Sequence, residues 1–337
     1  MADRADFIES FVEKAGWHDV RRSPLAGDAS FRRYERVSAN GDSCVLMDAP
    51  PPHEDVRPFL LLAGHLRNLG YSAPRVLAQD AENGLVLLED LGDDTYTRAL
   101  AAGADERELY EHAIDLLIDL HSQHLVVAVP DGLEPYDDAK MLEEAALFTD
   151  WYLPNTLHVP TAAPKRQAFL TIFRRLLPYV HEVPETLVLR DFHADNLMWL
   201  PKRRGLAACG LLDFQDAVVG PTAYDVMSLL EDARRELRPG LDEAMLARYH
   251  AAFPGRDRRA FEMAYAILGA QRHCKVIGIF TRLAYRDRKF DYLKHIPRVW
   301  RLLQRSCRHP MLAPLREWLD ANVPITQRTV PVQQRQA

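Results

Sequence analysis

The sequence has few cysteines, no long apolar run and a wide gap in its lysines. Its four cysteines, Cys44, Cys209, Cys274 and Cys307, are far apart and form no Cys-x-x-Cys pair, which argues against a disulfide framework or a cysteine zinc site. No stretch approaches the roughly 20 apolar residues that a membrane span requires, and the N-terminus has no apolar signal core. We therefore expect a cytoplasmic protein without a membrane partner.

The chain also lacks an excess of basic charge. Its 42 lysines and arginines are outnumbered by 48 acidic residues, so the charge balance predicts no nucleic-acid partner. There is no Gly-x-x-x-x-Gly-Lys-Ser/Thr phosphate loop and no Gly-x-Ser-x-Gly elbow, which excludes P-loop chemistry and gives no support to a hydrolase. Nothing in the sequence predicts an obligate protein partner.

Hydrophobic patterning divides the chain into two regions of different character. Residues 1–91 predict a helix, a hairpin with an Asn-Gly turn, a second helix and a second hairpin. Beyond them helices predominate, except for two apolar runs within residues 184–219. We expect an α+β fold of two lobes, a small β-containing nucleotide-binding lobe over 1–91 and a larger helical catalytic and acceptor-binding lobe over 92–325. A flexible polar tail, 326–337, is expected to follow.

Polar residues interrupt both apolar runs. "VLRDFHADNLMWL", residues 188–200, contains Asp191 and, five residues later, Asn196, while "GLLDFQ" ends a short predicted strand at Asp213. A phosphoryl transferase needs one carboxylate to orient the attacking hydroxyl, and an amide oxygen and a second carboxylate to hold Mg²⁺ against nucleotide phosphates. Asp-x-x-x-x-Asn is the spacing of the kinase catalytic loop, and "LDFQ" stands where the metal-binding Asp-Phe-Gly segment belongs. Because that spacing also arises by chance, the apolar run before each acid is what makes the pattern specific.

These segments carry a family resemblance. "LRDFHADNLMWL…GLLDFQDAVVGPTAYDVMSLL" resembles the aminoglycoside phosphotransferase-type kinases, which share the protein-kinase-like bilobal fold. Their usual loop is His-Gly-Asp, from which this chain departs at Arg190. "GDASFRRYERV", "LVLLEDLGDDTY", "GAQRHCKVIGIFTRL" and "HIPRVWRLL" are similar to bacterial cell-wall amino-sugar kinases, which phosphorylate the anomeric hydroxyl of N-acetylmuramate and N-acetylglucosamine. The resemblance spans about residues 23–305.

The resemblance implies a phosphotransferase with an alcohol group as acceptor, dependent on ATP and Mg²⁺, whose partners are the nucleotide and a small amino sugar. Asp191 would be the catalytic base, Asn196 and Asp213 the magnesium ligands, and Asp225 a buried helix residue that braces the catalytic loop. The sugar 1-phosphate would feed nucleotide-sugar synthesis in peptidoglycan recycling.

The nucleotide-binding residues follow from the same resemblance. "GDASFRRY" would be the loop over the phosphates, with Gly27 permitting close backbone approach and Ser30 beside it. "LLEDLG" would be the hinge, where backbone groups near Glu89 and Leu91 meet the adenine.

One residue that most kinases of this fold carry is missing. The third strand usually supplies a lysine for the α- and β-phosphates, but the matching strand here has Met47, and no lysine occurs between Lys14 and Lys140. An arginine fork binds phosphate oxygens well. We therefore hypothesise that Arg32 or Arg33 supplies the charge; the competing interpretation is that both are solvated hairpin residues.

Five residues are candidate acceptor contacts. His193 and Asp195 are expected to shape the catalytic loop or touch the sugar, since two ligands alone do not make a zinc site, and Asp216 could bind metal or sugar or cap a turn. Arg272 or Lys275 could meet the carboxylate that N-acetylmuramate has and N-acetylglucosamine lacks. An ordinary solvated helix face competes with that last hypothesis.

Two other functions stay open at this stage. One is a kinase of the same fold that acts on another small alcohol, such as an aminoglycoside or choline; a cationic acceptor would call for acids in the helical lobe, which the pairs at 143–144 and 231–232 could supply. The other is an inactive ATP-binding kinase-like protein, which the missing lysine would allow but the intact Asp191, Asn196 and Asp213 argue against.

Overall fold

The computed structural model describes residues 4–25 and 31–331. Its contacts divide the chain into two units: unit 1 comprises residues 1–116 and 194–217, and unit 2 comprises residues 117–193 and 218–337. Residues 92–116 and 194–217, which the sequence placed in the second lobe, thus make their contacts within unit 1. That residues 1–91 bind the nucleotide and residues 92–325 the acceptor stays a prediction.

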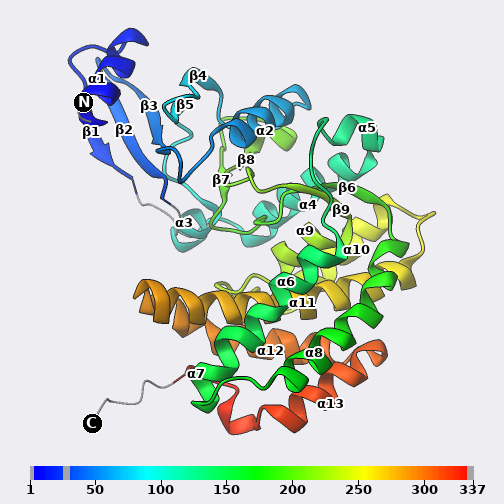
Figure 1. Cartoon of the computed structure of the whole chain (residues 1–337). Coiled ribbons are helices and arrows are strands. Elements are labelled where there is room, and N and C mark those ends of the chain that lie inside the picture. The colour runs from blue at the N-terminus through cyan, green and yellow to red at the C-terminus, as the bar shows by residue number, and fades with distance from the viewer. Residues whose placement is uncertain (1–3, 26–30, 332–337) are drawn as a thin grey trace. The chain divides into compact units, whose positions relative to one another are not determined.

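Unit 1 is built on a five-stranded antiparallel sheet (Figure 1). The strand order is β1-β2-β3-β5-β4, with bounds Arg21–Pro24, Arg33–Ala39, Asp42–Asp48, Leu85–Glu89 and Val76–Asp80 in that order. Both predicted hairpins are confirmed, whereas the edge strand β1 was not predicted. Asn40 and Gly41 both have positive φ, 53° and 91°, which is the backbone of a tight hairpin turn and explains the Asn-Gly pair.

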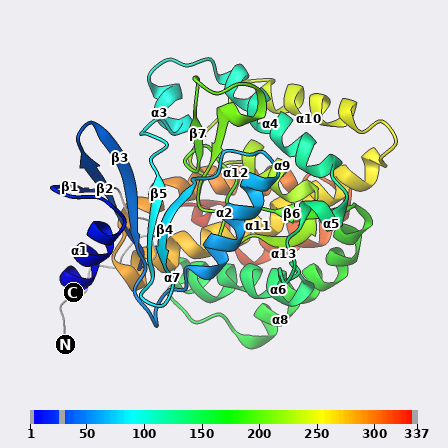
Figure 2. The same cartoon turned by 90° about the horizontal axis from the view of Figure 1, so that it is seen from above.

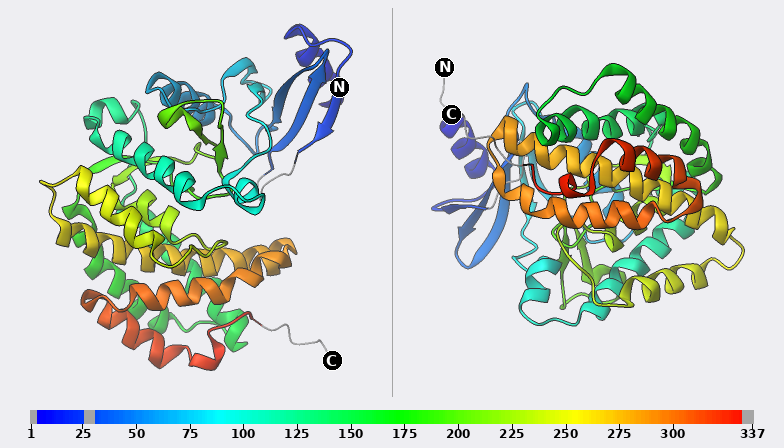
Figure 3. Two further views of the ribbon diagram at one scale, coloured as in Figure 1. Left: turned by 180° about the vertical axis from the view of Figure 1, so that it is seen from behind. Right: turned by 90° about the horizontal axis from the view of Figure 1, so that it is seen from below.

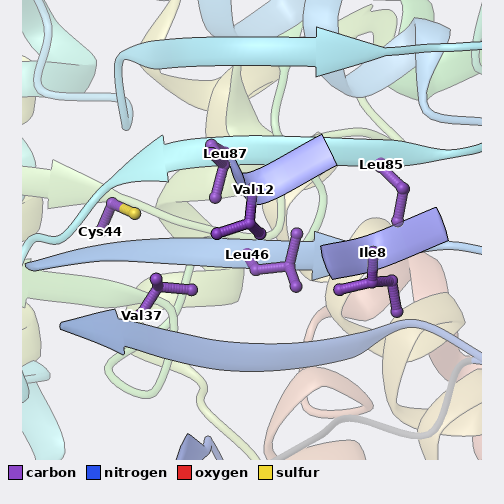
Figure 4. Close-up of a cluster of buried hydrophobic side chains, with 7 residues drawn as sticks. All are labelled: Ile8, Val12, Val37, Cys44, Leu46, Leu85 and Leu87. Atoms are coloured by element: carbon purple, nitrogen blue, oxygen red, sulfur yellow. The ribbon is translucent and has the colours of Figure 1, made fainter. Parts of the chain in front are cut away.

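Helix α1, Arg4–Lys14, packs on one face of this sheet (Figures 2 and 4). Ile8 and Val12 point from the helix onto strand residues that alternate along the sheet. These partners are Val37, Cys44, Leu46, Leu85 and Leu87. Because side chains alternate in a strand, Met47 and Val86, which are paired across β3 and β5, lie on the opposite face. Helix α2, Arg57–Asn68, is the second helix that the sequence predicted.

A small hairpin completes unit 1 and positions part of the candidate site. It consists of β7, Leu197–Trp199, and β8, Cys209–Leu211, paired antiparallel, with the 3₁₀ turn η3 (Gly205–Ala208) just before β8. A Cβ on Gly210 would lie 2.9 Å from Met198 Cβ and 3.0 Å from Leu200 Cδ1, so only glycine fits this close approach. The remaining helices are α3, Tyr96–Ala101, and α4, Glu106–Ser122, whose last turns belong to unit 2.

Unit 2 is organised around one long helix, α11, Arg258–Asp287, which contacts α6, α9 and α12 (Figure 3). A Cβ on Gly278 would lie 2.4 Å from the Leu147 backbone, so a glycine at this point lets α11 cross α6 closely. The other elements are α5 (Leu125–Ala128), α6 (Asp138–Leu147), η1 (Phe148–Tyr152), α7 (Leu153–Leu157), α8 (Ala163–Leu176), η2 (Leu177–Glu182), β6 (Glu185–Val188), β9 (Val218–Pro221), α9 (Ala223–Leu230), α10 (Leu241–Ala252), η4 (Phe290–His295), α12 (Ile296–Ser306), η5 (Pro310–Leu312), α13 (Ala313–Asn322) and η6 (Ile325–Gln327).

Prolines lie in the first turn of four α-helices of unit 2, α7, α8, α12 and α13. Proline is favoured in the first turn because its fixed φ suits the helix. A turn of π-helix, η1, joins α6 to α7. The core between these helices is aromatic, with Phe148 stacked on Phe169 at 5.6 Å between ring centroids.

The C-terminal segment is bonded to unit 2 as far as it is described. Tyr152 Oη donates to Gln327 O at 2.7 Å, and Tyr285 Oη donates to Pro331 O at 3.2 Å. Residues 332–337 of the predicted tail lie outside the described residues. Over the described ranges, no helix combines the length and apolarity needed to cross a membrane. All four cysteines are buried thiols.

Burial of His121 makes unit 2 sensitive to acid. The ring is 4% exposed and its Nδ1 lies 2.8 Å from Tyr249 Oη, as expected for a hydrogen-bonded core histidine. Burial, helped by Arg256, lowers its pKa to about 3 from 6.5. The unfolded chain therefore takes up this proton first as the pH falls, and folding stability is lost between about pH 6.5 and 3.

We predict that His121→Gln flattens this pH dependence. Its removal should reduce the slope of unfolding free energy against pH below 6.5 by up to about 1.4 kcal/mol per pH unit. Urea unfolding at several pH values measures the slope, with His124→Gln, an exposed histidine of the same region, as the control. An unchanged slope in the His121 variant would contradict the assignment.

Candidate functional site

The structure brings Asn196 and Asp213 together at the open end of the β7–β8 hairpin, just before β7 and just after β8. Leu212 N–H donates to Asn196 O at 2.9 Å, and Asn196 Nδ2 donates to Asp213 Oδ2 at 3.3 Å. Gln215 Nε2 donates to Asp213 Oδ1 at 2.7 Å, so both oxygens of this carboxylate face amide groups. This role of Gln215 was not predicted from the sequence; its place two residues after Asp213 was the available signal.

This donor set suits a hard cation. Asp213 offers carboxylate oxygens and Asn196 an amide group that can turn its oxygen toward a metal. Mg²⁺ is usually held by one or two carboxylates together with substrate phosphates and water, so two protein ligands are sufficient. Within the described residues, no group of three or more His, Cys, Asp or Glu side chains could hold a metal. Asp213 has φ 57°, a left-handed conformation that aspartate tolerates better than most residues.

The predicted hinge is fixed by ion pairs within unit 1. Arg203 donates to Glu89 Oε1 at 2.7 Å, and Arg36 donates to Asp90 at 2.6 Å through Nε. Asp90 also accepts from Ser43 and from the backbone N–H of Gly92. Leu91 lies beside β8, since its Cδ1 is 3.4 Å from the position of a Cβ on Gly210. A contact of Glu89 and Leu91 with adenine stays a prediction, and Gly27 and Ser30 lie outside the described residues.

Burial and pairing distinguish the two arginines proposed to replace the missing lysine. Arg33, the first residue of β2, pairs with Asp48; alternation puts it on the α1 side of the sheet, where it is exposed. Arg32 lies just before the strand. Arg32 Nε donates to Glu54 Oε2 at 2.9 Å, and the two side chains are 13% and 12% exposed. Glu54 also accepts the backbone N–H of Phe31 at 3.1 Å. The Arg32–Glu54 pair therefore favours Arg32.

In unit 2, Asp191 follows β6 in a loop that a buried carboxylate holds. Asp225 of α9 accepts the backbone N–H of Leu189 at 2.6 Å and of Arg190 at 3.0 Å, which confirms the predicted brace. Ser228 Oγ donates to Arg190 O at 3.3 Å. Asp225 is 1% exposed, and burial raises its pKa to about 7 despite the two N–H donors.

Arg190 occupies a position where the resemblance expects glycine, and its backbone shows why. Its φ is 67°, in the left-handed region that costs a residue with a Cβ about 1–2 kcal/mol. The Arg190 side chain pairs with Glu144 and lies 5.6 Å from the centroid of the Tyr136 ring. The ion pair offsets the strain, so the departure at Arg190 is structurally accommodated.

Glu144 is a buried carboxylate that gathers several donors. It is 6% exposed and pairs with Arg190 and, at 3.0 Å, with Lys275 Nζ. Tyr136 Oη also donates to it. Burial alone would raise the pKa of Glu144, but Lys275 and Arg190 hold it below its usual range. The pairing of Glu144 with these cations was not predicted from the sequence. Its place three residues after Met141, on the same face of α6, was a signal.

Arg272 is the buried cation beside Asp191. Its NH2 group lies 3.4 Å from Asp191 Oδ1 and its NH1 group donates to Tyr224 Oη at 2.9 Å. Burial alone would raise the pKa of Asp191, but Arg272 and Lys275 outweigh it and hold the pKa well below the ordinary range. Asp191 is therefore ionised at neutral pH. Both Arg272 and Lys275 are buried, so the solvated-face interpretation is wrong.

The remaining candidates are distributed over both units. His193 is buried in unit 2, with Nε2 3.4 Å from Arg234 NH1. Asp195 belongs to unit 1 and accepts a hydrogen bond from Thr97 Oγ1 at 2.5 Å. Asp216 is exposed and stands in the turn that Ala217 N–H closes by donating to Phe214 O. Sugar contacts of these three residues stay predictions.

We predict that Arg190→Gly destabilises unit 2 although it relieves backbone strain. Breaking a buried ion pair costs about 3–5 kcal/mol and the relieved strain returns about 1–2. Because Glu144 keeps Lys275, the expected net loss in unfolding free energy is about 2 kcal/mol. The control is Arg288→Gly, which has φ 61° but an exposed side chain and should gain about 0.5 kcal/mol. Equal stabilisation of both variants in urea unfolding would contradict the role of the ion pair.

Comparisons with known proteins place the chain in a family. Residues 21–261 match the family model APH, described as a phosphotransferase enzyme family. Curated proteins named N-acetylmuramate/N-acetylglucosamine kinase are similar over most of their length. The Caulobacter vibrioides protein is 38% identical over 95% of this chain and 96% of its own, and the Pseudomonas aeruginosa protein is 41% identical over 92% of each.

Solved structures with little sequence identity share the fold. A choline kinase from Streptococcus pneumoniae superposes with a TM-score of 0.60 at 12% identity, covering 91% of this chain and 99% of its own. An ADP-bound aminoglycoside phosphotransferase gives 0.59 at 18%, with the same coverage. The predicted α+β, protein-kinase-like fold class is confirmed. With a family match over most of its length and curated relatives near 40% identity, the chain belongs to the APH phosphotransferase enzyme family.

Proposed function

We propose that the chain is an ATP-dependent kinase that phosphorylates the anomeric (C1) hydroxyl of N-acetylmuramate, N-acetylglucosamine or both. The observation that carries this proposal is the 37–41% identity, over most of the chain, with four curated proteins that bear that name. The sugar 1-phosphate would supply nucleotide-sugar synthesis in peptidoglycan recycling. We place the reaction in the cytoplasm, where ATP is available.

Asp191 is proposed to orient the acceptor hydroxyl and take its proton. Its carboxylate is ionised and 37% exposed, so it can accept a hydrogen bond from a substrate. In a loose phosphoryl-transfer transition state the proton leaves late, and a weak base is enough. The bond from the acceptor oxygen to phosphorus forms as the bond from phosphorus to ADP breaks.

Asn196 and Asp213 are proposed to hold Mg²⁺. A bound magnesium ion would neutralise charge on the β- and γ-phosphates of ATP. Gln215 keeps the Asp213 carboxylate in place through its 2.7 Å hydrogen bond. Only four residues separate Asp191 from Asn196 in the chain, which is the spacing that the kinase catalytic loop uses for these two roles.

Arg32 is proposed to supply the phosphate-binding charge that Met47 cannot. In protein kinases the strand lysine pairs with a helix glutamate, and the Arg32–Glu54 pair, just before α2, offers a comparable cation and acid. Glu54 ties this arginine to the backbone of Phe31, which lies within the predicted phosphate loop.

A kinase for a cationic alcohol is less well supported. Such an acceptor needs acids that are available to it, yet Glu144 pairs with Arg190 and Lys275, and Glu231 pairs with His273 and Arg305. Glu143 is exposed and pairs with Lys140. Three of the four acids that would favour aminoglycosides or choline are thus paired with cations of the chain itself.

An inactive nucleotide-binding protein is the other alternative. Asp191, Asn196 and Asp213 are present, Asp191 is held ionised by Arg272, and Arg32 can stand in for the lysine. Asn196, Asp213 and Arg32 would also serve nucleotide binding, whereas a carboxylate at Asp191 that is held ionised is not needed for binding alone. That carboxylate favours an active enzyme.

Phosphorus NMR after incubation with magnesium-ATP and a panel of sugars and amines tests the proposal. We expect a new phosphate at C1 of an N-acetylated amino sugar, abolished by Asp191→Asn and not by Glu143→Gln. A phosphate on another alcohol would establish the second candidate, and nucleotide binding without turnover the third. Loss of product in Asp191→Asn with retained ATP binding would separate catalysis from folding.

We predict that Arg32→Ala raises the KM for ATP about tenfold or more, because a charge-assisted contact to phosphate contributes about 1.5–3 kcal/mol. Arg33→Ala, at an exposed position on the α1 side of the sheet, should leave it within about twofold. Glu54→Gln should raise the KM less than Arg32→Ala, since it disturbs only the placement of the cation. Unchanged ATP kinetics in Arg32→Ala would remove Arg32 from the phosphate site.

A further inference from the structure

Arg272 sits in the middle of α11 with its guanidinium fixed by two partners. Its side chain is 9% exposed. One terminal nitrogen faces Asp191 Oδ1 at 3.4 Å and the other donates to Tyr224 Oη at 2.9 Å. The guanidinium carbon lies 5.4 Å from the centroid of the Tyr224 ring. Both ends of the planar group are thus engaged within unit 2.

The other charges near Asp191 have their own partners. Lys275, one turn along α11, and Arg190 both pair with Glu144. Burial lowers the pKa of His193, so that ring is neutral at pH 7, and Asp225 is bonded to backbone N–H groups. Arg272 is therefore the cation whose position is matched to the Asp191 carboxylate.

This arrangement leaves little room for Arg272 to receive a substrate carboxylate. A second carboxylate would have to displace Asp191 or Tyr224 from a nearly buried group. It would then leave Asp191 without its cation, which is costly for an ionised side chain in this environment. The geometry favours a role that does not depend on the charge of the sugar.

We propose that Arg272, held by Tyr224, is the positioning residue of Asp191 and acts alike on both amino sugars. It fixes the Asp191 carboxylate through the 3.4 Å contact of its terminal nitrogen with Oδ1. This inference rests on the proposed function and deepens it by naming the residue that places Asp191 for either sugar.

The proton transfer that follows is simple. The O–H bond of the anomeric hydroxyl breaks as its oxygen bonds to the γ-phosphorus and the bond to the ADP oxygen breaks. The proton goes to the Asp191 carboxylate and then to solvent. Arg272 donates throughout and exchanges no proton.

Kinetics of Arg272→Gln, Arg272→Lys and Tyr224→Phe on both sugars test this role. We expect Arg272→Gln to lower kcat about 10- to 100-fold on each sugar, with the two losses within about threefold of each other and the KM for ATP unchanged. Tyr224→Phe should lose about threefold in the same direction, and Arg272→Lys should recover part of kcat. Arg286→Gln, an exposed arginine of the same helix paired with Asp287, is the control.

The pH profile supplies a readout that a purely structural residue would not move. Loss of Arg272 raises the pKa of Asp191, so the acid limb of kcat/KM should shift to higher pH in Arg272→Gln and not in Arg286→Gln. If Arg272→Gln does not fold, Tyr224→Phe and Arg272→Lys carry the same comparison.

Three results would overturn the inference: a loss at least tenfold greater on N-acetylmuramate, a change confined to KM, or an unshifted acid limb. The first would establish Arg272 as the carboxylate receptor. If the unmodified enzyme phosphorylates a different alcohol of the panel, the proposed function is wrong, and the same kcat and pH comparison on that alcohol decides the role of Arg272.

Discussion

The loop that carries Asp191 depends on two buried carboxylates. Asp225 takes the backbone N–H groups of Leu189 and Arg190, and Glu144 takes the side chain of Arg190. Without them, an arginine at φ 67° and buried backbone donors would have no compensation. Asp225 fixes the main chain of the loop, and Glu144 fixes the Arg190 side chain. Together they set the position of the next residue, Asp191.

Charge balance around this loop explains why it needs so many polar groups. Arg190, Lys275 and Arg272 contribute three positive charges, and Glu144 and Asp191 contribute two negative ones. Burial raises the pKa of Asp225 to about 7, so Asp225 carries only part of a third negative charge at neutral pH. The surplus of positive charge is small, and it favours the ionised form of the Asp191 carboxylate. Removing Glu144 would take away the acid that Arg190 and Lys275 share, and removing Arg272 would take away the cation 3.4 Å from Asp191.

The sequence predicted most of the local structure and only part of the site. The β2–β3 and β4–β5 hairpins follow from alternation and turn residues, and Asn196 and Asp213 were proposed from their spacing and the apolar runs before them. By contrast, Glu144 and Tyr224 act across pairs of elements far apart in the chain, 46 residues from Glu144 to Arg190 and 48 from Tyr224 to Arg272. No periodicity encodes such pairs. Arg190 could be recognised as a departure from glycine, but its reason, a positive φ offset by an ion pair, is visible only in three dimensions.

The proposed replacement of the strand lysine by Arg32 also places a cation where an acid can pair with it. Met47 is fully buried on the side of the sheet opposite α1, paired with Val86 and Tyr34. A lysine at that position would have to find an acid among apolar neighbours. Arg32 lies just before β2 and already has Glu54, which also accepts the Phe31 N–H. The proposed move of the cation from a strand interior to this position couples the charge to the backbone of Phe31, a residue of the predicted phosphate loop.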